Sequence, residues 1–139
     1  MHTDGNAISA NGAALAVEYR LTALPKTWIL DLDGTLMKHN GYRTEEGDTL
    51  LEGIGAFLEQ IEPEDLVVVL TSRKESERES TIRFLKENQI RYDHLIFEAP
   101  YGERIIVNDR KPSGREMAVA VNTDRDQACS AVFIRDEAL

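Results

Sequence analysis

Short apolar runs alternate with amphipathic stretches along most of the chain. The runs are rich in Val, Ile and Leu and lie at 27–33, 66–72, 94–98, 104–109 and 131–135. Each run is continuous and does not alternate with polar residues, which is typical of strands covered on both faces in a parallel sheet. The pattern therefore predicts parallel strands at these positions.

Three stretches between the runs have the signals of helices. The first, 49–61, has an apolar stripe at helical spacing formed by Leu50, Leu51, Ile54, Phe57, Leu58 and Ile61. The start signals have the spacing of capping boxes, in which each side chain satisfies a free backbone donor: Thr49 with Glu52, Ser72 with Glu75, and Ser113 with Glu116. Strands and helices in alternation with short connections predict a doubly wound α/β fold. We expect a three-layer, Rossmann-like parallel sheet with helices on both faces.

Residues 1–25 differ from the rest of the chain. They are small and polar at first and have no helical or alternating apolar period. Two interpretations stay open: a disordered N-terminal extension, or a strand or hairpin completed by a partner chain. Pro25 is the expected boundary, which leaves 26–139 as a single domain.

The composition limits the classes of molecule that the protein is expected to bind. The chain has 139 residues, of which 42% are hydrophobic, and its net charge of −9 makes a nucleic-acid or membrane partner unexpected. No apolar run approaches the roughly 20 residues that span a bilayer, and the N-terminus lacks the pattern of a secretory signal. Cys129 is the single cysteine, which excludes an intrachain disulfide and a zinc site built from cysteines. We expect a soluble, cytoplasmic protein.

The first predicted strand ends in acidic residues, in the sequence Asp31-Leu32-Asp33-Gly34. Residues two apart in a strand point to the same side, so Asp31 and Asp33 would converge on one spot. Such a pair can bind a hard cation such as Mg²⁺, or divide nucleophilic attack and proton transfer between its members. Gly34 would permit the tight exit that such a site needs. A simple Asp-Gly turn explains the same residues about equally well.

Two later strand ends carry compatible chemistry. Thr71 and Ser72 follow the second strand, where a hydroxyl and free backbone N–H groups can cradle a phosphate, although Ser72 is also expected to cap the next helix. Asp109 and Lys111 follow the run at 104–109, where they would supply a third metal-binding acid and a cation for a phosphate. An Asn-Asp turn is the alternative there. The order of acid pair, hydroxyl, and acid with lysine favours a common site.

This order resembles the haloacid dehalogenase (HAD) superfamily, most of whose members are Mg²⁺-dependent phosphohydrolases. The resemblance runs from about Trp28 to the C-terminus. DLDGT at 31–35 is similar to the first motif of the family, LTSR at 70–73 to the second, and IVND at 106–109 to the acidic fourth. In the family the first strand lies centrally, with the strands of the second and fourth motifs on either side.

The resemblance implies a role for each matching residue. Asp31 would be the nucleophile that forms an aspartyl-phosphate, and Asp33 would give a proton to the leaving oxygen and take one from water. Mg²⁺ would be held by Asp31, the main-chain carbonyl of Asp33, and Asp109. Thr71 would hydrogen-bond the phosphoryl oxygens, and Thr35 would order the loop. An Asp at position 33 is similar to the phosphatase pattern and unlike the dehalogenases.

The sequence departs from the family in two motifs. No lysine precedes the acidic strand where the third motif is expected, so Lys111 is the preferred substitute and Lys86 the fallback. The fourth motif reads Asn108-Asp109, with no second acid beside Asp109. The N-D-x-K-P element is similar to that of small bacterial members linked to capsule or lipopolysaccharide sugar pathways.

The intervals between the motifs are too short to hold a cap domain, which predicts a capless enzyme with an open site. A second copy of the chain that covers this site is one expectation. Other candidate substrate-binding residues are Gly34, Ser72, Lys38, His39 and Arg73. Lys38 and His39 belong to a flap that extends to Arg43, for which an exposed polar hairpin is an equal alternative. Arg73 begins a stretch with the pattern of a solvent-exposed helix face. To contact substrate, its side chain would have to extend from this face into the site.

The leading hypothesis is a Mg²⁺-dependent phosphatase that hydrolyses a small phosphate monoester, such as a sugar phosphate. Two alternatives belong to other classes. One is a receiver-like phosphoacceptor domain, which also places acids, Thr and Lys at the ends of a doubly wound sheet. The other is a catalytically silent binding or assembly domain, which the altered third motif favours.

Overall fold

The computed structural model describes residues 17–139, and the described chain divides into two units. The central unit comprises Pro25–Gly102 and Thr123–Cys129. The described part of the terminal unit comprises residues 17–24, Glu103–Asn122 and Ser130–Leu139. Parallel strands and a few helices make the protein a mixed α/β fold. No helix in the described range is long and apolar enough to cross a bilayer.

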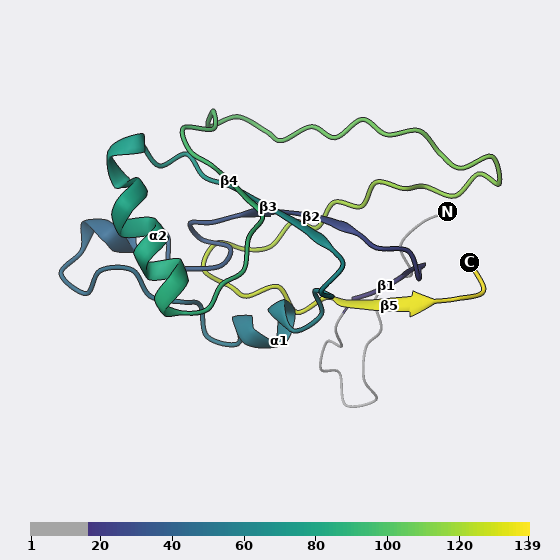
Figure 1. Cartoon of the computed structure of the whole chain (residues 1–139), viewed down its shortest axis with the longest axis horizontal. Helices are drawn as coiled ribbons and strands as arrows, with labels where there is room; N and C mark the ends of the chain where they lie inside the picture. Colours follow the sequence, from purple (N-terminus) through teal and green to yellow (C-terminus); the bar gives the residue numbers. More distant parts are fainter. Residues whose placement is uncertain (1–16) are drawn as a thin grey trace. The chain divides into compact units, whose positions relative to one another are not determined.

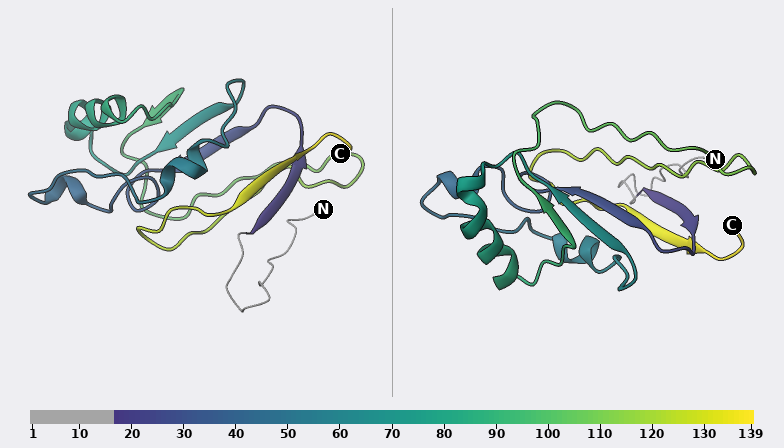
Figure 2. Two further views of the ribbon diagram at one scale, coloured as in Figure 1. Left: turned by 90° about the horizontal axis from the view of Figure 1, so that it is seen from below. Right: turned by 45° about the horizontal axis from the view of Figure 1, so that its top comes forward.

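A three-stranded parallel sheet forms the centre of the central unit. Its strands are β2 (Thr27–Asp31), β3 (Leu66–Leu70) and β4 (His94–Ile96), in the order β2-β3-β4. Figures 1 and 2 show these strands side by side. Asp31 pairs with Leu70, and Leu70 pairs with Ile96, so the carboxyl ends of all three strands share one edge. Three of the predicted strands are therefore confirmed, but β2 lies at the edge of this sheet and not at its centre.

The helices of this unit are shorter than their sequence patterns predict. They are η1 (Gly41–Arg43), α1 (Ile54–Leu58), η2 (Glu75–Glu77) and α2 (Arg78–Glu87). The helix expected at 49–61 is observed only as α1, which begins after Gly53 without a side-chain cap. The predicted capping box of Thr49 and Glu52 is therefore wrong. The reason lies in the preceding backbone. Thr49 and Leu51 are hydrogen-bonded to the chain at 36–38 and are not available for a helix.

The second predicted helix also begins later than expected. Its first turn is η2, and neither η2 nor α2 has a side-chain cap hydrogen bond, so the prediction that Ser72 caps it is wrong. The hydroxyl of the preceding residue, Thr71, instead accepts a hydrogen bond from the main-chain N–H of Arg73 (3.1 Å). This contact holds residues 71–73 in a non-helical turn.

One face of the β2-β3-β4 sheet is buried. Trp28, Leu30, Val67 and Val69 point to this face, and Phe57 of α1 meets the Trp28 ring edge to face at 5.7 Å. On the other face, Ile29, Leu66 and Ile96 are exposed at 40–47% of their surface, whereas Val68 and Leu70 are half-buried. Within residues 17–139, α1 packs against one face of this sheet.

The terminal unit contains a second parallel pair, β1 (Glu18–Thr22) with β5 (Val132–Asp136). Tyr19 and Phe133 stack at 5.3 Å, and Arg20 forms an ion pair with Asp136 at 2.8 Å. The strand interpretation of residues 1–25 therefore holds for Glu18–Thr22, whose partner is a strand of the same chain. Residues 1–16 lie outside the described range.

Residues 103–122 of the terminal unit contain no helix or strand, so the predicted strand at 104–109 and the helix starting at Ser113 are wrong. Figure 1 shows this stretch as an unlabelled green ribbon. Ile105 and Val107 are 84% and 92% exposed, so no packing supports a strand. Further along, Lys111 and Arg115 are joined by a main-chain hydrogen bond around Gly114, whose φ is +94°, and this turn occupies the expected start of the helix.

Candidate active site

The predicted acid pair lies at the carboxyl edge of the β2-β3-β4 sheet. Asp31 is the last residue of β2, and one of its carboxylate oxygens accepts a hydrogen bond from the Thr35 hydroxyl (2.8 Å). Asp33 lies in the following loop, where its carboxylate is 3.5 Å from the hydroxyl of Thr71. The structure therefore brings Asp33 together with Thr71, as the sequence predicts. Thr35 orders the loop through Asp31.

The loop after β2 is tightly wound. The main-chain carbonyl of Leu32 accepts hydrogen bonds from the N–H groups of Thr35, Leu36 and Met37, and the N–H of Gly34 donates to the carbonyl of Met37. Gly34 has a φ of +85°, a left-handed conformation that strains any residue with a Cβ atom. The expectation that Gly34 permits a tight exit is confirmed.

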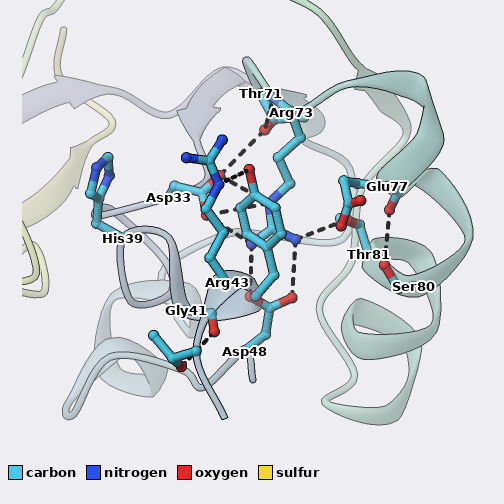
Figure 3. A network of polar contacts seen from close by, with 12 residues as sticks. Asp33, His39, Gly41, Arg43, Asp48, Thr71, Arg73, Glu77, Ser80 and Thr81 are labelled. Carbon is cyan, nitrogen blue, oxygen red and sulfur yellow. Dashed lines mark hydrogen bonds and ion pairs between the residues drawn. The ribbon is translucent and has the colours of Figure 1, made fainter. Parts of the chain in front are cut away.

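Arg73 is the best-connected side chain of the site, as Figure 3 shows. It donates to both carboxylate oxygens of Asp33, with a shortest distance of 2.7 Å from Nη2, and to both oxygens of Asp48 at 2.8 and 3.0 Å. Its Nη1 also donates to the Thr81 hydroxyl at 2.9 Å. The Arg73 side chain is only 1% exposed, so the interpretation of this residue as part of a solvated helix face is wrong.

The flap contributes to the same cluster. The Tyr42 ring lies against the Arg73 guanidinium, with its centre 4.2 Å from the central carbon, and Asp48, which follows the flap, forms an ion pair with Arg73. Neither Tyr42, Asp48 nor Thr81 was predicted from the sequence. Their contacts join segments far apart in the chain, and no motif or spacing marks them.

Electrostatics keep Arg73 charged. Burial lowers the pKa of Arg73, but hydrogen bonds to the carboxylates of Asp48 and Asp33 outweigh this and raise it above its ordinary value. One guanidinium faces two carboxylates, so the cluster keeps a net negative charge. The carboxylate of Asp31 adds to it. The carboxylates of Asp33 and Asp48 thus neutralise the positive charge of Arg73 inside the protein.

His39, predicted to bind substrate, lies beside the Gly34 turn. Its main-chain N–H donates to the carboxylate of Asp126 (2.7 Å), and the main-chain N–H of Asp126 donates to the carbonyl of Gly34 (2.8 Å). Asp126 belongs to the segment Thr123–Cys129, which returns to the central unit from the far end of the chain. No motif in the sequence marks this segment as part of the site.

The other candidates of the central unit are more exposed. Lys38 is exposed, and its main-chain N–H is bonded to the carbonyl of Thr49. Arg43 is exposed and donates to the Tyr42 hydroxyl at 3.2 Å. Ser72 is half-buried, and Lys86 is an exposed residue of α2. These residues remain candidates for substrate contact.

Asp109 and Lys111 belong to the terminal unit, where both are exposed in the irregular stretch 103–122. Across residues 17–139, no three His, Cys, Asp or Glu side chains gather as a metal-binding group. Mg²⁺ nevertheless often takes only one or two carboxylates from a protein, with water and substrate phosphate as its other ligands. The Asp31 carboxylate and the main-chain carbonyl of Asp33 have the hard oxygen chemistry that this ion prefers.

The chain was compared with family models, with curated proteins and with solved structures, and none of these comparisons found a match. The interpretation of the site therefore depends on its geometry and on the motifs in the sequence.

Proposed function

We propose that the protein is a Mg²⁺-dependent phosphatase that hydrolyses a small phosphate monoester, such as a sugar phosphate, through a phosphorylated Asp31. One observation carries this proposal. Asp31 ends one strand of a parallel sheet and Asp33 follows it, Thr71 follows the adjacent strand, and the Thr71 hydroxyl lies within 3.5 Å of Asp33. A nucleophile, a proton carrier and a hydroxyl donor thereby share one sheet edge, where α/β proteins bind their ligands.

In this reaction, a carboxylate oxygen of Asp31 attacks phosphorus, and the bond to the substrate oxygen breaks. The leaving oxygen takes a proton from Asp33. Water then attacks the phosphorus of the aspartyl-phosphate, gives a proton to Asp33 and releases inorganic phosphate, which restores the Asp31 carboxylate. The ion pair with Arg73 orients Asp33 and suits its base role more directly than its acid role.

Bound Mg²⁺ would offset the charge of the phosphoryl group, so that one anion can approach another. The Asp31 carboxylate and the Asp33 main-chain carbonyl would hold the ion, with Asp109 as the proposed third ligand. Thr71 would donate a hydrogen bond to a phosphoryl oxygen. The sequence motifs offer Lys111, or Lys86 in its place, as a candidate cation for the phosphate.

The finer fold assignment is part of the same proposal. The resemblance of DLDGT at 31–35 and LTSR at 70–73 to HAD motifs supports a HAD-like, three-layer fold without a cap domain. The open site would then accept an extended substrate or be covered by a second copy of the chain. With a single cysteine the protein needs no oxidising compartment, and we propose the cytoplasm as its location.

Phosphate release from a panel of sugar phosphates and an aryl phosphate tests the function. We expect turnover with Mg²⁺, none with EDTA, and loss in Asp31→Asn and Asp33→Asn. Glu87→Gln, an exposed change on α2, is the matched control and should keep full activity. Mg²⁺ binding without turnover of any ester would favour the silent binding domain, and a long-lived aspartyl-phosphate would favour the receiver-like domain.

A further inference from the structure

A tight turn in the segment Thr123–Cys129 is hydrogen-bonded to the loop that follows β2. Within this turn, the N–H of Gln127 donates to the carbonyl of Asp124 (3.1 Å), and Asp126 has a left-handed φ of +65°. Asp126 is hydrogen-bonded to Gly34 through its main chain and to His39 through its side chain. The turn therefore packs against the loop that contains Asp33 and Gly34.

Arg125 is the side chain that this turn places over the loop. A Cβ atom added to Gly34 would lie 3.2 Å from Cγ of Arg125, so the aliphatic part of the arginine packs against the glycine. The residue as a whole is exposed. In the described range, no hydrogen bond or ion pair engages its guanidinium. The stem of Arg125 is thus held beside Gly34, the residue after Asp33, and the charged end remains open to a ligand.

A phosphate group at this site needs such a cation. Asp31, Asp33 and Asp48 are negative, and a phosphate dianion that approaches them is repelled. Arg73 cannot relieve this repulsion directly, because its side chain is 1% exposed and is already paired with Asp33 and Asp48. Bound Mg²⁺ would offset part of this charge, and an exposed, unpaired cation next to the loop can supply the remainder.

We propose that Arg125 binds the phosphoryl group of the substrate, an inference that rests on the proposed phosphatase function. Its planar guanidinium can donate two parallel hydrogen bonds to phosphate oxygens, which the point charge of a lysine does not match. Packing of Cγ against Gly34 limits the positions that the guanidinium can take. Arg125, and not Lys111 or Lys86, then provides the cation that the sequence motifs lack.

The test combines equilibrium binding with kinetics on the full chain. Binding of inorganic phosphate in the presence of Mg²⁺ is measured by calorimetry, and KM and kcat are measured with an aryl phosphate. The variants are Arg125→Ala, Arg125→Lys, Lys111→Ala and Lys86→Ala. Arg83→Ala is the matched control, since Arg83 is an exposed arginine of α2 that pairs with Glu79. Circular dichroism verifies that each variant is folded.

We expect Arg125→Ala to weaken phosphate binding by about tenfold or more and to raise KM in parallel. Arg125→Lys should retain part of the affinity, and Arg83→Ala should bind as the wild type does. Lys111→Ala and Lys86→Ala should weaken binding less than Arg125→Ala does. If the wild type hydrolyses esters while Arg125→Ala binds phosphate equally well, this inference is overturned and the phosphatase stands. If the wild type binds phosphate but hydrolyses nothing, and Arg125→Ala abolishes binding, the inference is supported and the phosphatase fails. A wild type that binds no phosphate overturns both.

Discussion

Arg73 holds both carboxylate oxygens of Asp33, with Nε at 3.0 and 3.3 Å and Nη2 at 2.7 Å. The two residues are 40 positions apart and come together because β2 and β3 are adjacent and parallel. Each lies just beyond the carboxyl end of its strand. The register of two strands therefore fixes the orientation of the proposed proton carrier.

Loss of the Arg73 guanidinium should destabilise the protein strongly. Arg73→Met leaves the carboxylates of Asp33 and Asp48 facing each other without their shared cation, and we expect a loss of about 3–5 kcal/mol in the free energy of unfolding. Urea denaturation measures it. Arg73→Lys keeps the charge but not the paired hydrogen bonds, so it should fall between Arg73→Met and the wild type.

Arg83→Met is the control for this experiment, because it removes an exposed arginine that pairs with Glu79 on one helix. It should change the midpoint of urea denaturation little. Equal losses in Arg73→Met and Arg83→Met would contradict the buried ion-pair cluster.

The hydroxyl of Thr71 should matter more than its methyl group. Thr71 is 1% exposed, and its hydroxyl accepts from the N–H of Arg73. Thr71→Val keeps the shape of the side chain but leaves the buried N–H of Arg73 without an acceptor. We expect this change to cost about 1–3 kcal/mol in unfolding free energy. Thr71→Ser keeps the hydroxyl and should lose less. Thermal denaturation compares the two variants, and a more stable valine variant would argue against the hydrogen bond.

A Cβ atom at Gly34 should disturb the loop in two ways. Gly34→Ala strains a residue with a φ of +85° and brings its methyl group to 3.2 Å from Arg125. Strain of this kind costs about 1–3 kcal/mol. Gly47 also has a positive φ, +73°, but no atom within 4 Å of an added Cβ, so Gly47→Ala isolates the strain alone. We expect the larger stability loss, in urea denaturation, at Gly34, and the reverse order would contradict the close contact.

Asp65 should make stability depend on acid. Its buried carboxylate accepts hydrogen bonds, each 2.9 Å long, from Lys26 N, Trp28 Nε1 and Glu62 N. Burial alone would raise the pKa of Asp65, but these donors lower it below its ordinary value of 3.8. Because the pKa is lower in the folded state, the ionised carboxylate stabilises the fold at any pH above the ordinary pKa. This contribution is lost as the pH falls through the folded pKa.

Asp65→Asn should therefore be less stable at neutral pH by about 1–3 kcal/mol. Its unfolding free energy should also fall less steeply than that of the wild type as the pH drops below about 4. Urea denaturation across this pH range measures both effects. Parallel pH profiles for the two proteins would show that another group causes the acid sensitivity.

Local sequence patterns were sufficient for much of the central unit. The apolar runs at 27–33, 66–72 and 94–98 became β2, β3 and β4, because a short run of branched aliphatic residues favours a buried strand wherever it pairs. The turn at Gly34 was also predictable, since an Asp-Gly pair after a strand has few other conformations. These features depend mainly on neighbouring residues.

Features that depend on distant contacts were not predictable. The burial of Arg73 requires Asp48, which follows the flap, and Thr81 from α2, and neither position carries a motif. The run at 104–109 has the same apolar composition as the others but is exposed and forms no strand. An apolar run forms a strand only where it can pair with a neighbouring strand. Strand propensity alone did not distinguish these cases.

Trapping of the covalent intermediate tests the central claim most directly. The full-length protein is mixed with Mg²⁺ and an aryl phosphate, quenched, and reduced with borohydride, which converts an aspartyl-phosphate into homoserine. Peptide mass spectrometry then locates the modified position. The account predicts homoserine at position 31, absent without substrate and absent in Asp31→Asn. Phosphate release without any modification, or with modification at Asp33 in place of Asp31, would contradict it.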